Sequence, residues 1–70
     1  MKNRLLLELL VEVAPEKIAF LKFVLEGYDG LASISTISNR RGVVVLRYHS
    51  GSGDELTALL GSLPFVAVAD

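Results

Sequence analysis

The alternation of apolar and polar residues predicts that the chain begins with a β-strand. Between residues 4 and 13 every odd position is Leu or Val, whereas Arg4, Glu8 and Glu12 occupy even positions. A period of two gives an extended segment one fully apolar face. We therefore expect a strand over residues 4–13 whose odd residues face a core. Its even residues, Leu6, Glu8, Leu10 and Glu12 among them, should lie on the other face of a sheet.

The next segment is predicted to be a helix that ends near Gly27. Pro15 suits a first helical position, Glu16 lies near the positive end of the helix dipole, and Gly27 can supply the C-terminal cap. At about 100° per residue, one side of this helix is apolar and should face the core. That side carries Ile18, Phe20, Leu21, Val24 and Leu25. Phe23 falls outside it, and two interpretations stay open: an exposed interface residue, or a side chain that curls over the helix edge into the core.

The second half of the chain predicts two strands, a helix and a last strand. Residues 31–38 are predicted to form a strand whose two faces are poorly distinguished, which an edge strand tolerates. A polar loop over residues 38–42 follows. It leads to the apolar run 43–48, which suits a central strand. Ser52 and Glu55 have the spacing of a capping box for the second helix. Pro64 should end that helix before a short strand over 65–69. Its expected buried stripe is Leu56, Leu59, Leu60 and Leu63.

This order of elements is that of an α+β ferredoxin-like βαββαβ sandwich. In that fold a four-stranded antiparallel sheet carries both helices on one face. No linker, repeat or low-complexity tract divides the chain, so we expect residues 1–70 to form a single domain. The open face of the sheet should then be half apolar, with Arg47 lying across from Glu8 in a cross-strand pair.

Length and composition indicate that association stabilises this domain. A domain of 70 residues buries only about 60% of the surface its unfolded chain exposes. The chain has no cysteine and one histidine, so disulfides and a recognisable transition-metal set are not expected, and no cofactor is expected. Its hydrophobic fraction of 51% is high for this length. We therefore expect a homo-oligomer, most simply a dimer, or a stable protein partner. The expected interface residues are Leu6, Leu10, Phe23, Val43 and Val45.

Charge and hydropathy exclude several other partners. A formal net charge of −1 gives no general attraction for nucleic acid or an anionic membrane. The apolar run over residues 5–10 is far shorter than the roughly 18 residues of a membrane span. The expected open sheet face also lacks the aromatic platforms on which RNA bases stack. We expect a cytoplasmic protein without nucleic-acid or membrane partners.

The candidate catalytic and anion-binding residues have simpler explanations. His49, Ser50, Ser52 and Asp54 are close in sequence, but a catalytic triad needs fixed geometry, and these residues span a glycine-rich connector. The glycines at 51 and 53 could offer backbone N–H groups to an anion, although acidic residues already follow in the first helical turn. Capping and loop roles account for all of these residues, so we expect no enzymatic activity.

The first strand–helix junction resembles that of an ACT-like domain. Residues 14–21 read Ala-Pro-Glu-Lys-Ile-Ala-Phe-Leu and residues 25–28 read Leu-Glu-Gly-Tyr. In ACT domains a strand meets a helix at a Pro-Gly-x-Leu turn, and a glycine ends the helix before the second strand. Glu16 stands where that pattern has glycine. The chain also looks like the short stand-alone bacterial domains of unknown function.

The resemblance implies a regulatory module that dimerises and often holds an amino acid at this turn, near the dimer interface. On this sequence it implies a ligand site formed by Ala14, Pro15, Glu16, Tyr28 and Asp29. Glu16 would place a like charge beside the carboxylate of such a ligand. Two hypotheses follow. The first is a non-enzymatic interaction or regulatory module that acts as a homo-oligomer, assembled as a dimer through the open sheet face or an edge strand. The alternative is a small-ligand sensor that binds an amino-acid-like molecule at this turn, near a subunit interface.

Overall fold

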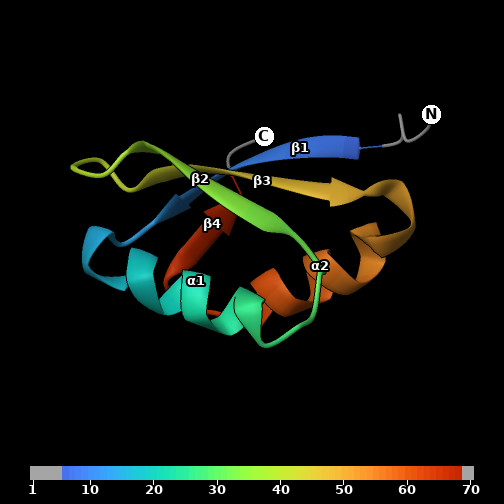
Figure 1. The fold of residues 1–70 in the computed structure, drawn as a ribbon. Coiled ribbons are helices and arrows are strands. Elements are labelled where there is room, and N and C mark those ends of the chain that lie inside the picture. Colours follow the sequence, from blue (N-terminus) through green and yellow to red (C-terminus); the bar gives the residue numbers. More distant parts are fainter. Residues whose placement is uncertain (1–5, 69–70) are drawn as a thin grey trace.

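The computed structural model describes residues 6–68 and confirms the predicted α+β order (Figure 1). Residues 4, 5 and 69, which we included in the first and last predicted strands, lie outside the described residues. A short 3₁₀ turn precedes each helix: η1 (Pro15–Lys17) and η2 (Ser50–Ser52). The main elements are β1 (Leu6–Val13), α1 (Ile18–Glu26), β2 (Ser33–Ser38), β3 (Val43–His49), α2 (Gly53–Gly61) and β4 (Val66–Val68).

The four strands form one antiparallel sheet in the order β2-β3-β1-β4. Both helices lie beneath the same face of the sheet in Figure 1, which is the ferredoxin-like arrangement. The apolar run of β3 is central, as predicted, and β2 is an edge strand, as its mixed faces indicated. Val11 and Val44 are paired in the register and are both buried on the helix side.

The core lies between the helices and the sheet. Its fully buried side chains come from both layers: Leu21, Leu46, Leu56, Leu60, Val11 and Val44. From α1, Ile18 and Leu25 join Leu21 in this core, as expected.

Our expectation for Phe20 was wrong, because its side chain is 48% exposed, and Val24 is only half-buried. The buried residues of α1 are Ile18, Leu21 and Leu25, so its buried face is centred on Leu21. Phe20 is then displaced from the centre of that face by about 100°.

The predicted capping box does not form. Ser52 makes no side-chain hydrogen bond to the start of α2, and its φ of −100° and ψ of 3° differ from the extended conformation that suits an N-cap. The η2 turn provides the entry to the helix instead, since the Gly53 N–H donates to the Ser50 carbonyl.

The β2–β3 hairpin is held closely against the end of β1 at Gly42. The Val13 N–H donates to the Gly42 carbonyl over 2.7 Å. Gly42 has a φ of +73°, and a Cβ placed there would lie 1.8 Å from the Val13 carbonyl oxygen. Only glycine fits this position without a shift of the backbone. The contact places Arg41, the preceding residue, beside the junction between β1 and η1.

Candidate functional site

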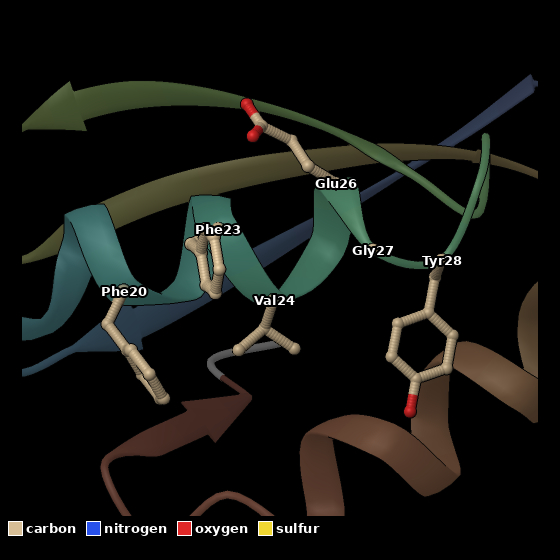
Figure 2. A pocket seen from close by; sticks show the side chains of 6 residues that line it. All are labelled: Phe20, Phe23, Val24, Glu26, Gly27 and Tyr28. Atoms are coloured by element: carbon tan, nitrogen blue, oxygen red, sulfur yellow. The ribbon is translucent and has the colours of Figure 1, made fainter.

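Aromatic side chains gather on the outer side of α1. Phe23 is 71% exposed, Phe20 48% and Tyr28 42%. Together with Val24 they form what we call the aromatic surface. These four residues, with Glu26 and Gly27, line an open and mainly apolar groove of about 490 Å³ (Figure 2). The exposure of Phe23 contradicts the interpretation in which it curls into the core.

Helical spacing explains how this surface arises. Phe20 and Val24 are four residues apart in α1 and share one flank of the helix, and Tyr28 follows in the turn after Gly27. Figure 2 shows these three side chains pointing to the same side, whereas Glu26 points the other way. Gly27 leaves the floor of the groove open, because a Cβ added there would meet only the Val24 carbonyl oxygen, at 3.4 Å.

One end of the aromatic surface is anchored by contacts with the strand β4 region. The Phe20 and Phe65 rings pack edge-to-face with centroids 5.7 Å apart. The Lys17 ammonium lies 5.8 Å from the Phe20 centroid and 5.9 Å from that of Phe65. An edge-to-face aromatic pair contributes about 0.5–1.5 kcal/mol beyond its buried area. Phe20 is therefore held in place while half of its ring stays exposed.

The open face of the sheet is less available for association than the sequence indicated. Leu6 and Leu10 are exposed and Val43 is half-buried, but Val45 is only 7% exposed within the single chain. Val45 can therefore contribute little to an interface, even though it lies on the predicted face.

Arg47 also places charge on this open face. Its Nε donates to Glu8 Oε2 over 2.9 Å and its Nη1 donates to Ser35 Oγ over 3.0 Å. The predicted Arg47–Glu8 pair is thus confirmed. Because Glu8, Arg47 and Ser35 belong to β1, β3 and β2, polar contacts cross three of the four strands.

A second groove, of about 360 Å³, lies at the junction between β1 and η1. Its walls include Ala14 and Pro15, as the predicted ligand site requires, together with Glu12, Arg41 and Phe65. Glu16 is exposed on η1 and is not among the residues that line the groove. The neighbouring backbone donors are already used, since the N–H groups of residues 13 and 14 donate to the Gly42 and Phe65 carbonyls. Glu12 and Arg41 are the charged residues among those that line this groove.

Tyr28 and Asp29 do not join this second groove within one chain. They follow the C-terminal end of α1, whose nine residues span about 14 Å, and Ala14 and Pro15 precede its N-terminal end. Asp29 and Gly30 have φ values of +37° and +82° and form the turn toward β2. Of the five predicted ligand residues, the structure therefore brings together only Ala14 and Pro15, and it places Tyr28 in the aromatic surface instead.

Two further properties are limited to the part of the chain that the structure describes. Within residues 6–68, no three His, Asp or Glu side chains are grouped in a way that would hold a metal ion. None of the helices described there has the length and apolar character needed to cross a bilayer.

Sequence reasoning missed Phe20, Val24, Glu12 and Arg41 as lining residues of the two grooves. The four-residue spacing of Phe20, Val24 and Tyr28 was a usable indication of a common flank. No sequence pattern indicated that Arg41 lies near Pro15, because the two residues are distant in sequence and the β2–β3 hairpin brings them together.

Comparison with known proteins identifies a family but no relative of known function. A family model described as "Domain of unknown function (DUF4911)" matches residues 11–66, which is more than half of the chain. No curated protein and no solved structure matches. The likeness to ACT domains stays an interpretation of the sequence.

Proposed function

The chain belongs to the DUF4911 family of domains of unknown function, and we propose that it is a non-enzymatic interaction module that associates with a second copy of itself. The aromatic surface of α1 forms the interface. One observation carries this proposal: Phe23, Phe20 and Tyr28 are 71%, 48% and 42% exposed and surround a single apolar groove. Exposed aromatic residues clustered in this way are typical of binding hot spots.

The available area is consistent with reversible association. The exposed parts of the three aromatic rings amount to roughly 300 Å² per copy, at about 200 Å² for a whole side chain. Two copies would together bury roughly 600 Å², which is below the about 1,200 Å² of a stable complex and within the range of weak, transient contacts. We therefore expect a dimer that forms at high protein concentration and dissociates on dilution.

The aromatic surface is a better interface than the open sheet face. Burial of the sheet face would take the Arg47–Glu8 pair out of water, and desolvation of such a pair offsets much of its attraction. The aromatic surface carries no ion pair between its own residues among those described.

A regulatory role in the cytoplasm agrees with the ACT-like junction and with the absence of cysteine.

The solution mass of the protein tests this proposal. Light scattering over a dilution series should give a dimer for the wild type at high concentration. Phe23→Ser should shift the equilibrium to monomer at all but the highest concentrations. Ile37→Ser is the matched control, because Ile37 is 62% exposed but lies on β2. A wild type that stays monomeric throughout, or a Phe23→Ser dimer as stable as the control, would refute the proposal.

A second candidate function rests on the groove between β1 and η1. Arg41 and Glu12 line it beside the apolar wall of Pro15 and Phe65. A guanidinium suits a carboxylate and a carboxylate suits an ammonium group. The groove therefore fits a small zwitterion of the amino-acid class, which is the alternative function of a ligand sensor.

Thermal stability in the presence of amino acids tests this second candidate. A ligand that binds only the native state must raise the melting temperature. Arg41→Ala should abolish that rise, whereas Arg40→Ala should keep it, because Arg40 is the adjacent residue and does not line the groove. If no amino acid raises the melting temperature of the wild type, this candidate is wrong.

A further inference from the structure

The N-terminal half of β1 has an open edge. On one side, residues 6–12 of β1 pair with β3, but on the other side β4 pairs only with residues 11–13 (Figure 1). Among residues 6–68, no strand lies on that second side next to Leu6, Leu7 and Glu8. We call these three residues the β1 edge. A strand edge of this kind is a template for pairing with another extended chain.

Backbone groups at the β1 edge point away from the sheet. The Ala14 N–H, at the end of β1, donates to the Phe65 carbonyl on the β4 side. Successive residues of a strand direct their backbone groups to alternate sides, so the even-numbered residues of β1 direct theirs to the β4 side. Leu6 and Glu8 therefore each offer an N–H donor and a carbonyl acceptor to an added strand.

The side chains along this part of β1 are apolar and exposed, apart from one charge. Leu6, Leu7 and Leu10 are each about half exposed. The Glu8 side chain is 61% exposed although it accepts a hydrogen bond from Arg47. Leu6, Glu8 and Leu10 share the open face, because strand residues alternate between the two faces of a sheet. An added strand would therefore meet an acidic residue between two apolar ones on that face.

The position of Glu8 disfavours a second copy of the chain as the added strand. Two identical strands that pair around a two-fold axis at Glu8 would place this carboxylate directly opposite its mate. Like charges directly opposite each other destabilise strand pairing. An axis at Leu10 would require the backbone of Glu12, which already pairs with Ala67 of β4. A strand with a basic residue opposite Glu8 meets neither obstacle.

We infer that the β1 edge binds an extended segment of another protein, in which a lysine or arginine lies between two apolar residues, each two positions away. The segment adds a strand beside β1 and continues the line of β4. In this mode of binding, main-chain hydrogen bonds provide affinity and alternate side chains provide specificity. The inference goes beyond the proposed function and is independent of it, since the aromatic surface belongs to α1 and Tyr28.

A synthetic peptide tests this inference by NMR. The probe is acetyl-Ser-Leu-Val-Lys-Val-Leu-Ser-amide, added to nitrogen-15-labelled protein at a concentration where the protein is monomeric. Backbone amide shifts should change between residues 6 and 10 and stay constant between residues 20 and 28. The same peptide with a methyl group on the backbone nitrogen of its lysine keeps every side chain but loses a donor that the added strand needs. Its dissociation constant should be about tenfold higher.

Charge exchange tests the preference for a basic residue. Glu8→Lys should weaken binding of the lysine peptide about tenfold, because an attraction becomes a repulsion. The same variant should bind a peptide with glutamate in place of lysine as tightly as the wild type binds the probe. Glu12→Lys is the matched control, because Glu12 is exposed on the same strand and face but already has β4 beside it. This control should bind the lysine peptide like the wild type.

The contrary results each overturn the inference. Amide shifts that do not respond to the peptide, or that change only between residues 20 and 28, would show that no strand is added at the β1 edge. So would an N-methylated peptide that binds as tightly as the probe. Shifts of residues 6–8 on dilution of the protein alone would identify a second copy as the occupant. Equal effects of Glu8→Lys and Glu12→Lys would overturn the choice of a basic partner.

Discussion

Replacement of Gly42 by alanine probes how closely the β2–β3 hairpin is held against the end of β1. A positive φ costs a non-glycine residue roughly 1–2 kcal/mol. The added Cβ would also lie 1.8 Å from the Val13 carbonyl oxygen, so the two backbones must separate. That separation breaks the Val13 N–H to Gly42 carbonyl bond, worth about 0.5–1.5 kcal/mol, and disturbs packing around buried Val13. We expect Gly42→Ala to lower the free energy of unfolding by about 3 kcal/mol or more.

Gly30→Ala is the matched control for this substitution. Gly30 also has a positive φ, +82°, but a Cβ there would meet nothing within 4 Å. Gly30→Ala should therefore lower the free energy of unfolding only by the cost of the positive φ, roughly 1–2 kcal/mol. Urea unfolding followed by circular dichroism, at one fixed protein concentration, measures both changes against a total stability of roughly 4–10 kcal/mol. Equal losses for the two variants would refute the reasoning, because they would show that the approach to Val13 is not tight.

Two further substitutions test other contacts of the fold. Ser52→Ala should change the free energy of unfolding by less than about 0.5 kcal/mol, because the Ser52 side chain makes no capping hydrogen bond. A loss of about 1 kcal/mol in the same urea experiment is typical of removing an N-cap and would contradict this. Arg47→Ala should lower stability by about 1 kcal/mol or less, since its pair with Glu8 is exposed, and the loss should shrink in high salt. A salt-independent loss of several kcal/mol would instead indicate that Arg47 acts through packing over Val45.

Much of the fold could be predicted from the sequence because hydrophobic periodicity differs between its elements. The alternation in β1 and the continuous apolar run of β3 identified the two central strands. The cross-strand pair of Glu8 and Arg47 followed from the register that these patterns favour. Local patterns decide such features because strand faces repeat every two residues.

The errors arose where the outcome depends on contacts distant in sequence. A helical projection assigned Phe20 to the core, but Phe20 lies about 100° around α1 from Leu21, the centre of the buried face, and Phe65 provides a partner at the protein surface. Ser52 had the spacing of a cap, but η2 fixes its backbone in a conformation that does not suit one. Tyr28 and Pro15 were assigned to one site, although α1 separates them.

The location of the interface is the central claim, and the concentration dependence of backbone amide chemical shifts tests it most directly. Nitrogen-15-labelled protein would be recorded over a dilution series that spans the dimer–monomer transition. Our account predicts that the shifts change mainly between residues 20 and 28, on the aromatic surface. Changes centred on Leu6, Leu10 and Val43 would place the interface on the open sheet face and contradict it, and so would spectra that do not change with concentration.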